Sequence, residues 1–147
     1  MVYDAVTGEA AWIRGKWKGH KVGTLLPSGY VQVRIKGRSY QLHRVIWLWM
    51  TGEWPPTQVD HRDTDRANNR WDNLRLATHT QNQWNTQTRS DNSSGYKGVT
   101  RPRGRTKWHA YINENGRRKF LGSYPTAEEA NQAAIAARQV AHGEFAR

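Results

Sequence analysis

The chain has 147 residues, so it forms one domain or two small ones, and each half is near the smallest size that supports its own core. Its net charge of +11 and pI of about 10.4 predict a polyanionic partner. The lack of cysteine excludes disulfides, thiolate zinc sites and cysteine nucleophiles, and no apolar run reaches membrane-spanning length.

The first half predicts a hairpin followed by a short helix. Residues 29–37 alternate between apolar and polar side chains, which is typical of a half-buried strand. The polar turn at residues 36–39 sends the chain back, and residues 42–50 predict a buried helix. Thr51-Gly52 ends this helix, and Pro55-Pro56 prevents its continuation.

The next stretch, residues 59–85, predicts the order strand, loop, strand, helix. Val59-Asp60 is a short strand, residues 62–73 form a polar loop, and residues 74–77 are a second strand. The helix covers residues 78 to about 87, with Thr78 as its N-cap. This order can bring His61 and the side chains of the helix into one pocket.

The second half predicts three strands and one helix after a polar, turn-rich linker. We place the first domain at residues 1–88, the linker at 89–95 and the second domain at 96–147. Its strands cover 96–101, 107–113 and 117–124, with a hairpin turn at Asn115-Gly116. Thr126 caps a helix that runs to His142 and stops at Gly143, with Glu129 as the capping-box partner. Its small-residue stripe, which suits close packing on a sheet, consists of Ala127, Ala130, Ala134, Ala137 and Ala141.

Asp60 and His61 have the residue types that phosphodiester hydrolysis needs. The reaction requires an activated water, neutralisation of phosphate charge and stabilisation of the leaving oxygen, and a divalent metal ion supplies the last two. A histidine near its ordinary pKa can activate the water. Adjacent residues on an extended segment point to opposite sides, so Asp60 can ligate a metal while His61 faces the water.

At this point the sequence resembles the HNH endonuclease family, in particular its phage and intron homing enzymes. The resemblance rests on Asp60-His61, on NNRWDNLRLAT at 68–78, on QNQWN at 81–85 and on LHRVIWLWMTGEWP at 42–55. It implies that His61 is the general base, that Asn73 orients its ring, and that Asp60 and Asn82 ligate one divalent metal ion. Many HNH proteins carry a histidine where this chain has Asn82, so two oxygen ligands favour Mg²⁺, or Mn²⁺, over Zn²⁺.

Other polar residues of this stretch fit structural roles better than chemical ones. For His43 we favour packing or a backbone contact over catalysis. Loop and turn roles suit Asp63, Asp65, Asn68, Asn69 and Asp72, while His79 and Asn85 could help bind metal or phosphate but are assigned structural roles. Four arginines could contact phosphates or simply form a solvated face: Arg62, Arg66, Arg70 and Arg75.

The second half predicts a DNA-binding sheet. Between Lys97 and Lys119 there are eight basic residues and one acidic residue. On the middle strand, residues 108, 110 and 112 face the helix, which leaves a basic and aromatic face open, as a sheet laid on DNA requires. The alternative is a solvated basic sheet without base contacts, and Phe120 could alternatively belong to the core.

This half resembles the ethylene-response-factor DNA-binding domain of plants. The resemblance rests on GYKGV at 95–99, KWHAYI at 107–112, FLGSY at 120–124, TAEEA at 126–130 and AHGEFA at 141–146. It implies that the sheet enters the major groove of duplex DNA. The implied contact residues are Lys97, Arg101, Arg103, Arg105, Tyr111, Asn113, Arg118 and Phe120, although the turn that holds Arg103 and Arg105 departs from the plant pattern.

The sequence therefore predicts an α+β protein: a ββα-metal (HNH) nuclease core plus a three-stranded antiparallel sheet packed on one α-helix. The predicted function is metal-dependent nicking or cleavage of double-stranded DNA, with 5′-phosphate ends by family analogy. We expect an intracellular protein of a bacterial host, of phage or mobile-element origin, without a membrane partner or an obligate protein partner. Three alternatives stay open: an inert DNA-binding regulator, a nuclease of branched DNA or RNA, and a nucleic-acid packaging protein.

Overall fold

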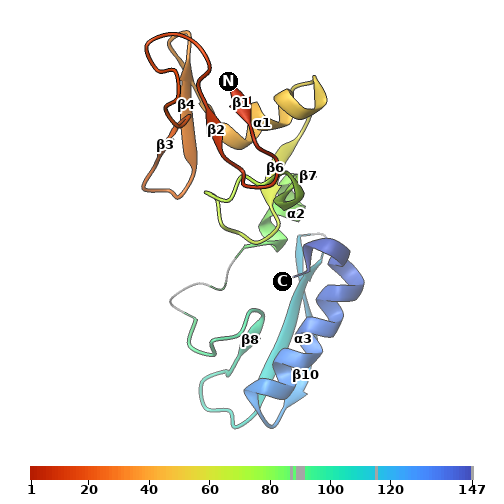
Figure 1. The fold of residues 1–147 in the computed structure, drawn as a ribbon. Helices are drawn as coiled ribbons and strands as arrows, with labels where there is room; N and C mark the ends of the chain where they lie inside the picture. The colour runs from red at the N-terminus through yellow and green to blue at the C-terminus, as the bar shows by residue number, and fades with distance from the viewer. Residues whose placement is uncertain (87, 89–91, 115, 147) are drawn as a thin grey trace. The chain divides into compact units, whose positions relative to one another are not determined.

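The chain forms two compact units, Met1–Asn82 and Gln83–Arg147, in a computed structural model that describes residues 1–86, 88, 92–114 and 116–146 (Figure 1). Both units combine antiparallel strands with helices, so the expected α+β class is confirmed. The division falls inside a helix, ahead of the limit expected at residue 88. Part of the expected linker, residues 89–91, lies outside the described residues, so the domain limits stay a prediction.

Two small sheets build the N-terminal part of the first unit. β1 (Val2–Tyr3) pairs with β2 (Ala10–Ala11), and β3 (Thr24–Leu25), β4 (Val31–Ile35) and β5 (Arg38–Gln41) form a three-stranded sheet. The alternating segment therefore forms a strand as expected, and the turn at Lys36 and Gly37 has positive φ angles of 47° and 80°. The two-residue strands β1, β2 and β3 were not predicted, because two residues contain no periodicity.

The helix α1 (Leu42–Thr51) closes the core of this unit. It ends at Gly52, whose left-handed φ of 79° lets its amide donate to the carbonyl of Leu48, which confirms the expected termination. Its inner side buries Leu42, Val45 and Ile46 against buried residues of neighbouring strands: Val33, Val59 and Leu74. Partly buried tryptophan rings pack against this core, among them the pair Trp47–Trp71 with ring centroids 5.0 Å apart.

A strand–loop–strand–helix segment follows, as the sequence predicts. β6 (Gln58–His61) pairs antiparallel with β7 (Leu74–Ala77), a 3-10 turn η1 (Trp71–Asn73) precedes β7, and α2 (His79–Trp84) follows it. Thr78 caps α2, since its hydroxyl accepts from the amide of Gln81 while the Gln81 side chain accepts from the amide of Thr78. The helix ends at Trp84, before the expected end at residue 87, and residue 87 lies outside the described residues.

The second unit is a three-stranded sheet covered by one helix. β8 (Val99–Thr100), β9 (Trp108–Glu114) and β10 (Arg117–Tyr124) lie in the order β10-β9-β8. Figure 1 shows α3 (Ala127–His142) running along this sheet, and a 3-10 turn, η2 (Gly143–Phe145), follows. β8 is shorter than the expected strand at 96–101. The expected hairpin turn includes Asn115, which lies outside the described residues.

The predicted alanine stripe is the surface by which α3 contacts its sheet. Ala130 and Ala134 are fully buried against Val99 of β8 and Ala110 of β9. Thr126 caps the helix as expected, because its hydroxyl accepts from the amide of Glu129. The small side chains let the helix lie close to one face of the sheet.

Candidate active site

The β6–β7 hairpin separates the two residues expected to carry the chemistry. In the register of the hairpin, Asp60 lies opposite Arg75 and His61 lies opposite Leu74. Because side chains alternate along a strand, Gln58 and Asp60 share one face and His61 lies on the other. Both Asp60 and His61 are buried, with exposed fractions of 6% and 3%. The expected separation of the two side chains is therefore present.

Arg75 holds the carboxylate of Asp60 from the neighbouring strand. Its Nε donates to Oδ2 of Asp60 at 2.9 Å, and one terminal nitrogen lies at 2.9 Å from the same oxygen. Both side chains are almost completely buried, so the ion pair is desolvated and fixed in orientation. Arg75, which the sequence suggested as a phosphate contact or a solvated charge, is a buried partner of the expected metal ligand.

Asn82 reaches the same face of the hairpin from α2. Its Nδ2 donates to Oε1 of Gln58 at 2.7 Å, and the amide of Gln58 lies 3.4 Å from Nδ1 of His79. Since Gln58 and Asp60 share one face of β6, Asn82 is directed toward the side of the hairpin that carries Asp60. The bond to Gln58 also fixes the amide of Asn82, so that its oxygen is the atom left for ligation.

A carboxylate and an amide oxygen on one face fit a hard divalent cation better than zinc. Mg²⁺ typically takes one or two protein oxygens and keeps several waters or phosphate oxygens. Among the described residues, no group of three histidine, aspartate or glutamate side chains could hold a metal ion. Asp60 and Asn82 are thus the candidate ligands, and the identity of the ion stays a prediction.

His61 is held by Asn69, a residue that the sequence assigned to a turn. Nε2 of His61 lies 3.2 Å from Oδ1 of Asn69, in a fully buried contact. The Asn69 amide is oriented by its Nδ2, which donates to the carbonyl of Ala67 at 3.1 Å. An amide oxygen can only accept, so Nε2 carries the proton in this bond and Nδ1 is the basic nitrogen of His61.

Burial keeps the ring of His61 neutral. Removal from solvent lowers the pKa of His61 below its ordinary value, while the bond to Asn69 and the carboxylates of Asp63, Asp60 and Asp65 act in the opposite direction. The net direction is downward. A neutral imidazole at neutral pH is the form that can accept a proton from water, as a general base must.

Asn73 organises the loop that follows His61. Its Oδ1 accepts from the amide of Asp63 at 3.1 Å, and its Nδ2 donates to the Asp63 carboxylate at 3.0 Å and to the carbonyl of Asn68 at 2.8 Å. Burial opposes ionisation of Asp63, but hydrogen bonds from Asn68 and Asn73 hold the pKa of Asp63 below its ordinary value. The role of Asn73 in orienting His61 stays a prediction, to which the structure adds Asn69 as a direct partner of the ring.

Two further rings surround His61. The ring of His43, from the first turn of α1, meets the His61 ring nearly perpendicularly, with centroids 4.9 Å apart. The Tyr30 ring packs against both rings, with its centroid 5.4 Å from that of His43 and 6.1 Å from that of His61. The guanidinium of Arg66 lies over the Tyr30 ring, 4.8 Å from its centre. The expected packing role of His43 is therefore directed at the candidate base.

In the second unit, the sheet face opposite α3 carries four of the eight expected DNA contacts. We define the open face as His109, Tyr111 and Asn113 of β9 with Arg118 and Phe120 of β10. Phe120 pairs with Tyr111 and is 52% exposed, so it lies on the surface and not in the core. The guanidinium of Arg118 lies 3.8 Å from the Tyr111 ring centre, and the rings of Tyr111 and Phe120 are 5.3 Å apart.

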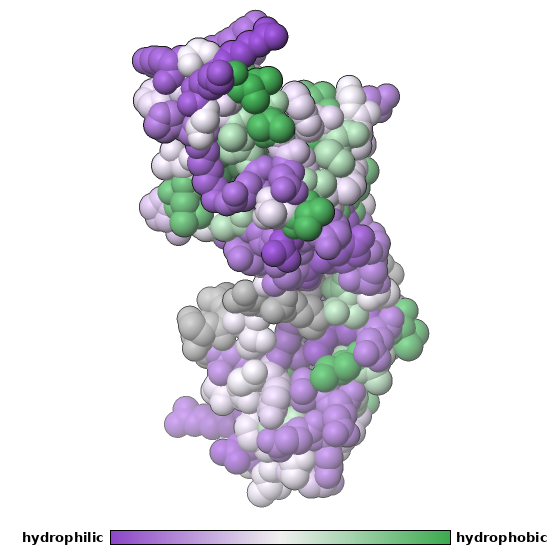
Figure 2. All heavy atoms as spheres, in the orientation of Figure 1, coloured by the Kyte–Doolittle hydropathy of each residue, from purple (hydrophilic) through white to green (hydrophobic). Residues whose placement is uncertain are grey.

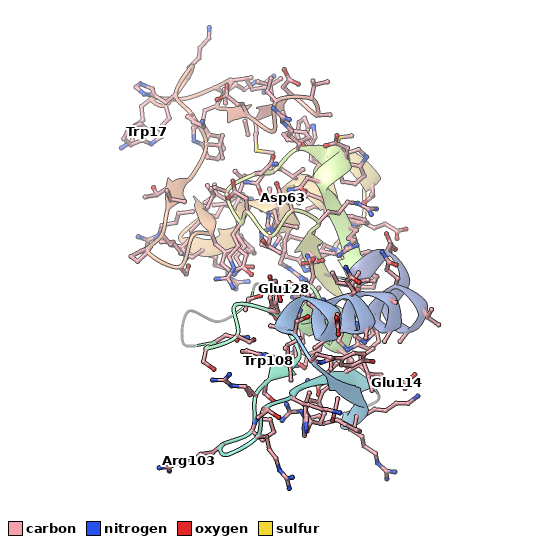
Figure 3. All side chains as sticks on the ribbon, turned by 90° about the horizontal axis from the view of Figure 1, so that it is seen from below. Trp17, Asp63, Arg103, Trp108, Glu114 and Glu128 are labelled. Atoms are coloured by element: carbon pink, nitrogen blue, oxygen red, sulfur yellow. The ribbon has the colours of Figure 1, made fainter. Side chains whose placement is uncertain are left out.

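The remaining expected contacts lie in loops. Arg103 and Arg105 are exposed in the turn between β8 and β9, and Figure 3 shows the side chain of Arg103 extending away from the ribbon. Arg101 lies over the ring of Trp108 at 5.2 Å. Lys97 instead donates to the backbone carbonyls of Trp84 and Thr86, so its ammonium group is used inside the second unit. In Figure 2, hydrophilic atoms cover much of the visible surface of this unit.

Sequence reasoning missed three contributors to the candidate active site: Asn69, Gln58 and Tyr30. Each contacts a predicted site residue from another part of the chain. Asn69 and Tyr30 lie outside the helices and strands, where residue spacing gives no periodic signal, whereas Gln58 lies in β6. The cross-strand position of Arg75 could have been predicted, because pairing residues 58–61 with 74–77 places it opposite Asp60.

No helix in the described ranges is long and apolar enough to cross a membrane.

Comparison with known proteins identifies the family. A family described as HNH endonuclease matches residues 40–84, which contain α1, β6, β7 and α2. Protein 3.8 of Escherichia phage T7 is 32% identical over 106 residues, which are 71% of this chain and 87% of that protein. The uncharacterized HNH endonuclease L560 of Acanthamoeba polyphaga mimivirus is 39% identical over 108 residues, 72% of this chain and 55% of that protein. A solved structure, described as DNA binding and cleavage by the HNH homing endonuclease I-HmuI, is 22% identical and covers 92% of this chain and 82% of its own, with a TM-score of 0.42. The chain therefore belongs to the HNH endonuclease family.

Proposed function

We propose that this HNH endonuclease nicks or cleaves duplex DNA with a divalent metal ion, and that its second unit binds the DNA site. One arrangement carries the proposal. Asp60 and Asn82 are directed to one face of the β6–β7 hairpin, and His61 lies on the opposite face with a fixed tautomer. A metal ion and a water-activating base can thus act from two sides of one short element.

His61 would accept the proton of the attacking water at Nδ1. Asn69 holds the Nε2 proton, which leaves Nδ1 as the basic position, and burial keeps the ring neutral before the reaction. The proton of the water would pass to Nδ1 as the oxygen attacks phosphorus. Asn69 would then hold the resulting imidazolium ring in place through its amide oxygen.

Asp60 and Asn82 would hold the divalent ion, with Mg²⁺ favoured and Mn²⁺ as the alternative. When bound, such an ion neutralises phosphate charge and stabilises the leaving 3′ oxygen. Arg75 fixes the Asp60 carboxylate, and Gln58 fixes the Asn82 amide, so the two ligand side chains are oriented before metal arrives. Leaving of the 3′ oxygen would give 5′-phosphate and 3′-hydroxyl ends.

The open face of the second unit would bind the DNA. Arg118 stacked on Tyr111, beside the exposed ring of Phe120, offers both charge for phosphates and flat apolar surface for sugars and bases. The resemblance to the ethylene-response-factor domain agrees with this use of the sheet and stays part of the proposal. We further propose that the protein acts inside a bacterial host, as a phage or mobile-element enzyme.

Cleavage of supercoiled plasmid tests the proposal. Wild-type protein should convert the plasmid to open circle or linear DNA with Mg²⁺ or Mn²⁺ and not with EDTA, and His61→Ala should reduce conversion to a small residual rate. Ligation of the products to 3′-hydroxyl and 5′-phosphate acceptors tests the predicted ends. Tight DNA binding without cleavage of any plasmid, including one that carries a selected binding site, would support an inert regulator instead.

A further inference from the structure

His43 is the only buried imidazole of the first unit, apart from His61, among the described residues. It has an exposed fraction of 3% and lies at the second residue of α1. Its ring meets the ring of His61 at 81° with centroids 4.9 Å apart, and Tyr30 packs against both. A buried side chain on α1 thus contacts the candidate base at the end of β6.

One nitrogen of the His43 ring, Nδ1, makes no hydrogen bond to any described residue in the folded structure. Nδ1 of His43 is buried and has no hydrogen-bond partner among the described residues. A buried polar atom without a partner lowers stability, so a phenylalanine or leucine would fill this position at less cost. Burial, with the nearby His61 and Arg44, lowers the pKa of His43 to about 3, so the ring is neutral and retains one donor and one acceptor.

Hydrogen bonds of catalytic groups are often unmade in a free enzyme and form only in its complex with substrate. An unpaired nitrogen in contact with the general base is consistent with that behaviour. We propose that His43 is a positioning residue: its nitrogen takes a hydrogen-bond partner when DNA is bound, and the ring then fixes His61 in its reactive orientation. This inference rests on the proposed nuclease function.

The substitution His43→Phe separates the ring from its nitrogen. Phenylalanine keeps a flat ring against His61 and Tyr30, and it removes the unpaired polar atom. We expect kcat for plasmid nicking to fall about 10- to 100-fold, because small errors in orientation are costly, while KM stays within about twofold. The melting temperature should stay equal or rise. A residue that served only packing would give a stable and fully active variant, which would overturn the proposal.

Two more variants make the test specific. His43→Asn restores a polar atom near the position of Nδ1 without the ring, and it should recover part of the activity lost in His43→Phe. Ile46→Val removes one methylene from a fully buried neighbour on α1 and should lower stability by about 1 kcal/mol without lowering kcat. If kcat follows the melting temperature across these variants, His43 acts only through stability and the proposal is wrong.

The parallel His61→Ala variant separates this inference from the proposed function. If His61→Ala cleaves far more slowly than wild type, the nuclease function stands, and the His43 variants then decide the present proposal. Adding His43→Phe to His61→Ala should lower the residual rate no further, because His43 acts through His61. A further loss of about tenfold in the double variant would show independent action and contradict the positioning role. If wild type itself does not cleave, the proposed function has failed and the inference falls with it.

Discussion

At the scale of single residues, the pair of Asp60 and Arg75 joins a candidate metal ligand to a buried partner of opposite charge. The carboxylate expected to ligate a metal ion is buried, and its charge is balanced by the guanidinium of the neighbouring strand. Removing one member of a buried pair leaves an unpaired buried charge. We expect Arg75→Met to lower the free energy of unfolding by about 3–5 kcal/mol, measured by urea denaturation.

The double variant supplies the control for this pair. Asp60→Asn combined with Arg75→Met removes both charges. The double variant should therefore lose clearly less free energy of unfolding than the sum of the losses in the two single variants. Additive costs would mean that the two side chains do not stabilise one another.

The buried ring of His43 makes stability depend on pH. The pKa of His43 is about 3 in the folded protein and near 6.5 in an unfolded chain. Between these values the unfolded state binds more protons, so the free energy of unfolding falls as pH falls below about 6.5. His43→Phe removes this proton uptake. When pH is lowered from 7 to 5, the free energy of unfolding, measured by urea denaturation, should fall in both proteins. The fall should be smaller in His43→Phe than in wild type, by up to about 2 kcal/mol. Equal losses would contradict a neutral buried His43.

The candidate site was predictable where residues lie in regular elements. Asp60 and His61 alternate on a strand, so their separation follows from the sequence, and the position of Asn82 follows from a short capped helix. Asn69 was not predictable as the partner of His61. It lies in an irregular loop, where residue spacing fixes no direction, and its contact depends on how that loop folds back on β6.

At the scale of elements, Gly98 sets how closely the segment before β8 approaches β9. Its φ is +77°, its carbonyl accepts from the amide of Tyr111, and a methyl group on it would collide with the carbonyl oxygen of Tyr111. Gly98→Ala should therefore lower the free energy of unfolding by about 2–4 kcal/mol, from backbone strain and overlap together. Thermal or urea unfolding measures the effect.

Gly104 provides the matched control for that substitution. Its φ of +73° is similar, but nothing lies within 4 Å of an added methyl group. Gly104→Ala should cost only the conformational strain, about 1–2 kcal/mol. Similar losses in the two variants would mean that the close approach to Tyr111 contributes nothing.

The long elements of the fold were predictable, and the short ones were not. α1, β4, β10 and α3 contain enough residues to show periodicity, caps and stop signals, as with Thr126 at the start of α3 and Gly52 at the end of α1. The strands β1, β2 and β3 contain two residues each and form only because partners from elsewhere in the chain lie beside them. β8 is shorter than predicted because only Val99 and Thr100 pair with β9.

At the scale of the whole molecule, the net charge of +11 predicts DNA binding that weakens steeply with salt. Each neutralised phosphate releases counterions, which adds about −0.9 to the slope of log K against log salt concentration. In the full-length protein, Arg118→Ala should reduce the magnitude of that slope by about one unit if its guanidinium contacts a phosphate. Titration of labelled duplex DNA at several salt concentrations measures the slope.

Phe120→Ala serves as the uncharged counterpart on the same open face. The exposed ring displaces no counterion, so its loss should weaken DNA binding while leaving the salt slope unchanged. If neither substitution changes affinity or slope, DNA binds through another surface, and the proposed use of the sheet is wrong.

The helix α2 has a consequence for engineering chimaeric nucleases. Asn82 belongs to the first unit, and Trp84, two residues later, belongs to the second. The Trp84 ring stacks on the ring of His142 with centroids 4.0 Å apart, and its backbone carbonyl accepts a hydrogen bond from Lys97. A recombination junction in the region expected to be a linker would transplant the second unit without Trp84, its stacking partner. Donor modules exchanged onto this scaffold should therefore begin at Gln83, so that the donor supplies its own equivalent of that tryptophan.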